Sequence, residues 1–266
     1  MGTQFIEMSD GIRLACDEAG EGDPPMVLVH GWCCQRSYMR PQLEHFSRRY
    51  RTLAIDLRGH GESDVPEAGA YAIERHSDDI AELCQRLGVR RPVVVGHSMG
   101  GAIALALAAR FPDVPSAIVM LDGAVLFPAH LAGALPAVIE TWRGQDFRER
   151  LRPFVEGMFI ASDDAALRRR IIEDMLAQPQ HVVIAEIESL VAFDGETAAK
   201  ACTTPSLYIG SAEPVADMGR LKELMPGCLR AQTAGAGHFH QLEVPEQVNI
   251  MIERFLAING LSGGAR

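Results

Sequence analysis

The stretch Pro92-Val93-Val94-Val95-Gly96-His97-Ser98-Met99-Gly100-Gly101 decides the fold of this chain. Its apolar start is typical of a buried strand, and the Ala- and Leu-rich run 99–111, which stops at Pro112, is typical of a buried helix. Between them stands the pattern G-x-S-x-G, which acts as a nucleophile elbow when a strand precedes it and a helix follows it. The pattern therefore predicts that Ser98 sits on a tight turn with its hydroxyl exposed, in preference to a glycine-rich turn that only packs.

Short apolar runs alternate with helical patterns on both sides of this stretch. The alternation indicates an α/β fold with a mostly parallel sheet flanked by helices. The spacing of apolar residues predicts a helix over 72–87, which would provide the crossover between two parallel strands. Eight strands are expected, over 3–8, 12–19, 26–30, 50–56, 92–96, 116–121, 206–209 and 229–233.

The segment 125–194 differs from the rest, because it shows helical periodicity and no convincing strand. Four helices are expected in it, marked by Leu131, Leu135, Val138 and Ile139, by Leu151, Phe154, Val155 and Met158, by Leu167, Ile171, Ile172 and Met175, and by Ile184, Ile187, Leu190 and Val191. The alternation of strand and helix resumes at Thr204. We therefore expect 125–194 to be a helical cap inserted into a core made of 1–124 and 195–266.

Composition and charge exclude several classes of function. The 266 residues fit one core with an insertion, and 25 Lys and Arg against 35 Asp and Glu give a net charge of −10. Without a basic run, nucleic acid is excluded as the main partner, because phosphate neutralisation supplies most of that affinity. The longest uncharged stretch, 92–109, carries Gly96, His97 and Ser98 at its centre, so we expect no membrane span.

The N-terminus and the cysteines indicate a compartment. Residues 1–7 have neither the basic nor the apolar region of a secretory signal. The six cysteines show no C-x-x-C spacing, and the adjacent Cys33 and Cys34 cannot easily bridge each other. We expect reduced thiols and a cytoplasmic protein.

A serine nucleophile needs a base, and the sequence offers one near its C-terminus. Gly235-Ala236-Gly237-His238-Phe239 follows a strand-like run and precedes a helix expected over 245–257, so His238 lies on a loop made flexible by glycine. His240 is close by, and we interpret it as a loop or pocket-wall residue. The sequence contains no H-E-x-x-H, no paired Cys and His spacing and no G-x-G-x-x-G after the first strand, so no metal and no cofactor are expected.

These motifs together resemble a serine-dependent member of the α/β-hydrolase fold family. The resemblance is carried by His30-Gly31-Trp32, by Asp56-Leu57-Arg58-Gly59-His60-Gly61-Glu62-Ser63, by the Ser98 elbow, and by Gly237-His238-Phe239 with Glu243-Val244-Pro245-Glu246. It implies that the backbone N–H groups of Trp32 and Met99 form an oxyanion hole. It also implies a structural role for 56–63, beside the site.

The acid of the triad has two main candidates. Most members of the family have an aspartate at the fourth place of a G-x-x-D pattern after the strand over 206–209, and here that place holds Glu213. Other members place the acid where Asp122 follows the strand over 116–121. Asp122 ranks slightly ahead of Glu213, because a short side chain at a strand end is easier to orient. Asp217 is a weaker third candidate.

The residues thus predict a serine hydrolase that cleaves an ester or related acyl bond through an acyl-enzyme on Ser98. Its partner would be a small or medium hydrophobic molecule, with no nucleic acid and no membrane, and a homodimer is left open. Seven apolar cap residues are available to face the site, although each could belong to the cap's own core: Leu131, Leu135, Phe154, Met158, Phe159, Met175 and Leu190.

The sequence resembles two further classes of enzyme with this fold less closely. Cofactor-independent dioxygenases of the same fold have an oxyanion loop similar to Gly31-Trp32-Cys33 and an acid where Asp122 lies, but they have a histidine where this chain has Met99. C–C bond hydrolases usually have asparagine where this chain has His97. Epoxide hydrolases and dehalogenases need an aspartate nucleophile, which Ser98 argues against. A non-catalytic receptor is disfavoured because Ser98 and His238 are both retained.

Overall fold

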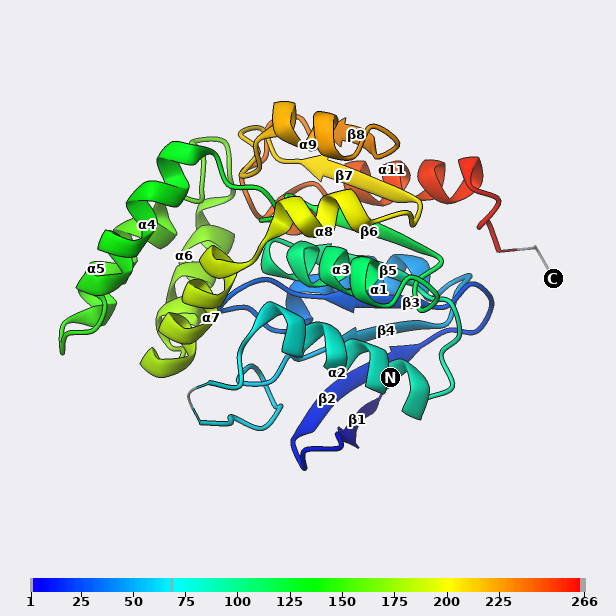
Figure 1. Cartoon of the computed structure of the whole chain (residues 1–266), viewed down its shortest axis with the longest axis horizontal. Coiled ribbons are helices and arrows are strands. Elements are labelled where there is room, and N and C mark those ends of the chain that lie inside the picture. The colour runs from blue at the N-terminus through cyan, green and yellow to red at the C-terminus, as the bar shows by residue number, and fades with distance from the viewer. Residues whose placement is uncertain (1, 68, 264–266) are drawn as a thin grey trace.

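A computed structural model describes residues 2–67 and 69–263. It confirms an eight-stranded, mostly parallel sheet flanked by helices (Figure 1). The strands are β1 (Gly2–Glu7), β2 (Arg13–Ala19), β3 (Met26–Val29), β4 (Thr52–Ile55), β5 (Val93–His97), β6 (Ala117–Leu121), β7 (Ser206–Gly210) and β8 (Leu229–Gln232). Their order is β1-β2-β4-β3-β5-β6-β7-β8, and only the β1/β2 and β2/β4 pairs are antiparallel.

Helices cover both faces of this sheet. The core helices are η1 (Arg36–Met39), α1 (Arg40–Phe46), α2 (Ile73–Arg86), α3 (Met99–Arg110), α8 (Gly195–Ala201), α9 (Met218–Leu224), α10 (His240–Glu243) and α11 (Pro245–Ile258). Helices α2, α3 and α8 lie in front of the sheet in Figure 1, and α1 and α11 lie behind it. Each side has its own apolar cluster, and β5 contributes Val94 to one and Val93 and Val95 to the other. This alternation follows from the two-residue period of a strand that is buried on both faces.

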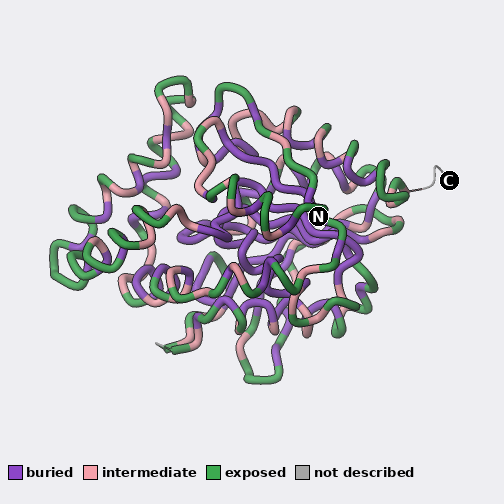
Figure 2. The backbone as a smooth tube through the Cα atoms, turned by 45° about the horizontal axis from the view of Figure 1, so that its top comes forward, coloured by how far each residue is buried: buried purple, intermediate pink, exposed green. Residues whose placement is uncertain are grey.

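The central strands β3 to β7 are buried along their whole length, so the residues at their ends have a fixed backbone. Figure 2 shows the centre of the molecule mostly in the colour of buried residues, whereas the outer helices alternate between buried and exposed residues. The strand expected over 50–56 is shorter in the structure, because the backbone N–H of Tyr50 bonds to Phe46 O in the preceding helix at 2.9 Å. The short helices α1, α9 and α10 were not expected, because four to seven residues are too few to show a helical period.

The segment between β6 and β7 contains four successive helices before α8. They are α4 (Ala129–Thr141), α5 (Phe147–Glu156), α6 (Ala165–Leu176) and α7 (Gln180–Ala192). They lie at the left in Figure 1, beyond one end of the sheet, while α8 packs against α3 of the core. Within the described residues, no helix combines the length and the apolar character that a membrane crossing needs. All six cysteines are free thiols.

Candidate active site

Ser98 stands on a strained turn between β5 and α3. Its backbone has φ 52° and ψ −115°, a conformation that a residue with a side chain rarely adopts. The turn leaves no room for side chains beside it, because a Cβ atom on Gly96 would lie 2.0 Å from Gly100 O, and one on Gly100 would lie 2.4 Å from Val29 O. The two glycines of the motif therefore allow the turn that presents the Ser98 side chain at the end of β5.

The loop after β3 packs directly against this turn. A Cβ atom on Gly31 would lie 3.0 Å from the Ser98 Cβ. Trp32 follows Gly31 and lines the same cavity as Ser98, and Met99 is the first residue of α3. In the part of the chain that the structure describes, the backbone N–H groups of Trp32 and Met99 have no hydrogen-bond acceptor. Both donors are thus available to an oxygen atom bound near Ser98, where the N-terminus of α3 also favours negative charge.

His238 lies opposite this turn and is held at three points. Its Nδ1 atom lies 2.7 Å from Asp122 Oδ2, and its backbone N–H donates to Met158 O at 3.1 Å. Its carbonyl accepts a hydrogen bond of 2.9 Å from His97 Nε2. With Nδ1–H donated to the carboxylate, Nε2 of His238 is the nitrogen left to accept a proton.

Asp122 directly follows β6 and is almost fully buried. Its backbone φ is 42°, a second strained position. Its Oδ1 atom accepts hydrogen bonds from the backbone N–H groups of Val215 at 3.2 Å and Ser211 at 3.3 Å, and from Tyr208 Oη at 3.4 Å. Burial alone would raise the pKa of Asp122, but the hydrogen bond and charge of His238 and the N–H donors outweigh it and lower this pKa to about 2. The carboxylate is therefore ionised at neutral pH.

The other two candidate acids lie apart from His238. Glu213 is exposed at the rim of the cavity, and among the described residues its carboxylate forms no hydrogen bond or ion pair. Asp217 is also exposed, and its side chain accepts a hydrogen bond of 2.9 Å from Arg220 N as the cap of α9. The structure brings Asp122 to His238 and does not bring Glu213 or Asp217 there.

A cavity of about 400 Å³ opens above these groups. Ser98, Asp122 and His238 lie on its floor, with Ser211 and Glu213 at its side. Most of its walls are apolar and come from 125–194: Phe127, Leu131, Leu135, Pro153, Phe154, Met158, Ile160, Ile187 and Leu190. Of the seven apolar residues expected there, Phe159 lies elsewhere and stacks on Phe239, with ring centroids 5.2 Å apart. Met175 does not line this cavity, but it lines a small neighbouring hollow that Ser98 and His238 also line.

The structure gives two histidines beside the site a place or role that the sequence did not predict. His240 is not a pocket-wall residue, because it is fully buried at the start of α10 with Nδ1 3.0 Å from Thr233 Oγ1. Sequence reasoning gave no structural role to His97, whose ring lies 4.7 Å from that of His238. Burial, together with the charge of His238, lowers the pKa of His97 well below its ordinary value, so its neutral ring donates to the His238 carbonyl. Its position inside the G-x-S-x-G motif is the only signal that could have identified it.

Ionisable side chains near the cavity do not form a metal site. Within 2–67 and 69–263, no group of three or more His, Cys, Asp or Glu side chains is arranged to hold a metal ion. What the arrangement offers is a serine hydroxyl, an imidazole with one free nitrogen, a buried carboxylate that orients this ring, and two free backbone donors. These are the kinds of group that nucleophilic acyl chemistry uses.

Comparisons with known proteins agree with the fold. The family model of the alpha/beta hydrolase fold matches residues 24–245. The 2-(acetamidomethylene)succinate hydrolase of Mesorhizobium japonicum is 38% identical over 111 residues, which cover 42% of this chain and only 39% of that relative. An esterase from Thermogutta terrifontis superposes with a TM-score of 0.84 at 25% identity, covering 97% of this chain and 99% of the esterase. The N-acyl homoserine lactone degrading enzyme Est816 has a TM-score of 0.83 at 26% identity, covering 95% and 100%. The chain belongs to the α/β hydrolase fold family.

Proposed function

We propose that this chain is a serine hydrolase that cleaves an ester or related acyl bond of a small or medium hydrophobic substrate. The observation that carries the proposal is the 2.7 Å contact between His238 Nδ1 and Asp122 on the floor of the cavity that Ser98 also lines. It supplies a ring nitrogen that is oriented and free to act on the Ser98 hydroxyl.

In the proposed reaction, Nε2 of His238 takes the Ser98 proton as Oγ attacks the substrate carbonyl. The negative oxygen that forms is bound by the backbone N–H groups of Trp32 and Met99. The carbonyl then re-forms, the bond to the leaving alcohol breaks, and His238 gives its proton to that alcohol. Water, deprotonated by His238, attacks the acyl-enzyme, and the carboxylic acid leaves as Ser98 regains its proton.

Asp122 has two tasks in this cycle. It keeps the proton of the neutral ring on Nδ1, so that Nε2 remains the basic nitrogen, and it stabilises the imidazolium that forms in the transition state. Its low pKa, about 2, suits both tasks, since the carboxylate stays charged while the ring changes its protonation.

The cavity supports a hydrophobic acyl substrate. Its volume of about 400 Å³ falls within the range of small-molecule sites, and its walls are mainly apolar. We propose that 125–194 acts as the cap, since residues from this segment form most of those walls. The esterase and the lactone-degrading enzyme that superpose on nearly the whole chain support an ester or a lactone as the bond cleaved.

The test is a substrate panel with the wild-type protein and Ser98→Ala. The panel consists of p-nitrophenyl esters with acyl chains from acetate to decanoate and of lactones with matched chain lengths. We expect hydrolysis with an optimum at short or medium chains, and loss of turnover in Ser98→Ala. An absence of hydrolysis across the panel, or equal turnover by the variant, would reject the proposal.

The pairing of Asp122 with His238 also favours a second candidate, a cofactor-independent dioxygenase, because those enzymes resemble this chain in the place of their acid. An oxygen electrode with hydroxyquinolone-type substrates separates the two activities. Oxygen consumption without added cofactor, together with no ester hydrolysis, would favour the dioxygenase.

A further inference from the structure

A second group of ionisable side chains is buried outside the cavity, between α7 and the core. Glu186 of α7 is completely buried. Its Oε2 atom lies 3.1 Å from His60 Nε2, and its Oε1 atom lies 3.3 Å from His76 Nε2. His60 belongs to the loop after β4, and His76 belongs to α2. We call these three residues the Glu186 cluster; it connects α7 to two separate segments of the core.

The cluster holds a pair of opposite charges. Burial alone would raise the pKa of Glu186, but the positive charge of His60 and the contact with His76 outweigh it and lower this pKa to about 2. Burial alone would lower the pKa of His60, but the charge of Glu186 outweighs it and raises this pKa. The His60 Nδ1–H donates to Arg58 O at 3.1 Å, and Nε2 lies 3.1 Å from Glu186 Oε2 in an ion-pair contact without hydrogen-bond geometry. Removing one partner would leave an uncompensated buried charge, which is costly.

His30 connects the cluster to the loop that carries Trp32. The His30 ring packs edge-on against His60, with centroids 4.9 Å apart. Its Nε2 accepts a hydrogen bond of 3.0 Å from Leu57 N, and its Nδ1–H donates to Gly31 O at 2.8 Å. Burial and the charge of His60 lower the pKa of His30 to about 3, so this ring is neutral with one fixed tautomer. Through His30, the cluster supports the backbone next to Trp32.

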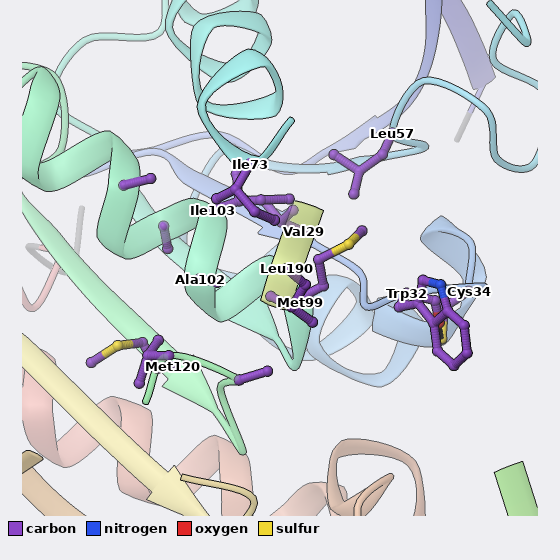
Figure 3. Close-up of a cluster of buried hydrophobic side chains, with 14 of the residues drawn as sticks. Val29, Trp32, Cys34, Leu57, Ile73, Met99, Ala102, Ile103, Met120 and Leu190 are labelled. Atoms are coloured by element: carbon purple, nitrogen blue, oxygen red, sulfur yellow. Dashed lines mark hydrogen bonds between the residues drawn. The ribbon is translucent and has the colours of Figure 1, made fainter. Parts of the chain in front are cut away.

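Helix α7 reaches the site from the other side of the cluster. Val183, three residues before Glu186, accepts a hydrogen bond of 2.9 Å from the Trp32 indole N–H at its carbonyl. Ser189, three residues after Glu186, accepts one of 2.9 Å from Ile73 N at the start of α2. Leu190, one turn after Glu186, lines the cavity and belongs to the buried cluster drawn in Figure 3 with core residues of β3 and α3. One helix thus carries the cluster, a wall of the cavity and a hydrogen bond to Trp32.

We propose that Glu186 is a positioning residue: His60 and His76 hold its carboxylate, and through it they hold α7 and the Trp32 loop in the arrangement that acyl transfer requires. The test of this role by kcat rests on the proposed function. The test by its effect on the surroundings of Trp32 does not. The step it serves is stabilisation of the oxyanion at the Trp32 backbone, where small displacements are costly.

The other titratable groups around the cluster are a phenol, two thiols and a carboxylate. The Tyr71 ring lies 6.5 Å from that of His76, and burial raises the pKa of Tyr71 to about 12. Burial also raises the pKa of the thiols of Cys33 and Cys34. Asp56, on the loop below His60, is ion-paired with Arg36. A change of charge in the cluster near neutral pH therefore falls on His60, whose pKa is raised by Glu186.

The directions of the pKa shifts of Glu186 and His60 define the pH range in which the cluster stabilises the protein most. The lowered pKa of Glu186 makes its contribution present above the ordinary value of 4.5 and lost as the pH falls toward 2. The raised pKa of His60 makes its contribution fully present below the ordinary value of 6.5 and lost as the pH rises through the folded-state value. The cluster should hold α7 best between pH 4.5 and 6.5 and weaken on the alkaline side.

The first experiment compares Glu186→Gln with Glu188→Gln, a matched change two residues further along α7. Glu188 is exposed and paired with Arg143 on the surface. The kcat and KM of ester hydrolysis are measured from pH 6 to 9.5. We expect Glu186→Gln to lower kcat on the order of tenfold at pH 6, and the ratio of wild type to variant to close toward 1 as the pH rises. A ratio that does not change with pH, or an equal loss in Glu188→Gln, would overturn the proposal.

A second measurement needs neither a variant nor ester turnover. Trp32 and Trp142 are the two tryptophans of the chain and stack with ring centroids 5.8 Å apart, so intrinsic fluorescence reports on this region. We expect the emission of the wild type to shift as the pH rises from 6 to 9. An unchanged emission over this range would overturn the proposal even if Glu186→Gln fails to fold. A shift in a protein that hydrolyses no ester would retain the cluster and reject the proposed function alone.

Discussion

The molecule contains two buried groups of histidine and carboxylate that differ in their access to the cavity. In the first, the His238 side chain is 12% exposed and Asp122 is 1% exposed, and both line the cavity. In the second, Glu186, His60 and His76 are all fully enclosed. In both groups the pKa of the carboxylate is lowered to about 2 by its histidines, against the effect of burial. The charges are therefore similar, and the surroundings differ.

The difference shows what separates a group that can act on a substrate from one that can only hold structure. Nδ1 of His238 lies 2.7 Å from Asp122 Oδ2, and the ring lines the cavity, which leaves Nε2 as the nitrogen open to a bound molecule. His60 has oxygen atoms near both nitrogens and no opening to solvent. A catalytic base needs one nitrogen within reach of the proton it takes, and only His238 meets that condition.

Removal of the proposed nucleophile should have the largest effect, and it should affect the Asp122–His238 group and not the Glu186 cluster. Ser98→Ala is expected to lower kcat by roughly 10⁵ to 10⁶-fold, because the loss of a triad nucleophile abolishes the acyl-enzyme route. The tryptophan emission and its pH dependence should stay as in the wild type, since the Glu186 cluster does not use the hydroxyl. The measurements are single-ester kinetics and a fluorescence titration. A variant that keeps more than a tenth of its turnover would contradict the serine mechanism.

Removal of the carboxylate proposed to orient His238 should have the second largest effect. Asp122→Asn is expected to lower kcat by roughly 10³ to 10⁴-fold, because the amide stabilises the wrong tautomer of the ring and cannot balance the imidazolium. Glu213→Gln should cost far less, since Glu213 lies at the rim of the cavity. The measurement is kcat for both variants, each checked by thermal melt. A thousandfold loss confined to Glu213→Gln would reverse the assignment, and small losses in both would return Asp217 to consideration.

A change of pH should have the smallest effect. It should act in opposite directions on the Asp122–His238 pair and on the Glu186 cluster. The activity of the wild type is expected to fall on the acid side, because an imidazolium at His238 cannot accept the Ser98 proton. Asp122 cannot cause this acid limb, since its pKa is about 2. The Glu186 cluster should instead weaken on the alkaline side. The measurement is kcat in overlapping buffers, and a flat profile from pH 8 to 5 would exclude His238 as the base.

Local sequence patterns predicted the fold and most of the candidate site, since the information lies in neighbouring residues. The apolar run before Ser98 and the Ala-rich run after it predict strand, turn and helix together, and the family model that matches 24–245 confirms the fold. Trp32, Ser98 and His238 were named from the motifs around them, and the structure places them on one cavity. Their roles remain predictions until the kinetics above are measured.

Features that depend on how distant segments meet could not be predicted. The choice between Asp122 and Glu213 depends on the loop after β7, which turns the backbone N–H groups of Ser211 and Val215 toward Asp122. No residue type in that loop predicts that its N–H groups point toward Asp122. Glu186 is a single acidic residue in a helical pattern, which usually indicates a solvated face. It becomes a buried ion only because α7 packs beside the histidines of two other segments.

The attachment of α7 also has a consequence for how substrate preference can diverge in descendants of this chain. A new side chain at Ile187 or Leu190 would reshape the cavity but would also disturb the helix that holds the Trp32 indole. Leu131 and Leu135 line the same cavity from α4, which has no buried ion pair to the core among the described residues. Selection for a different acyl chain can therefore proceed by successive substitutions in α4, while α7 stays unchanged as the inherited part of the pocket.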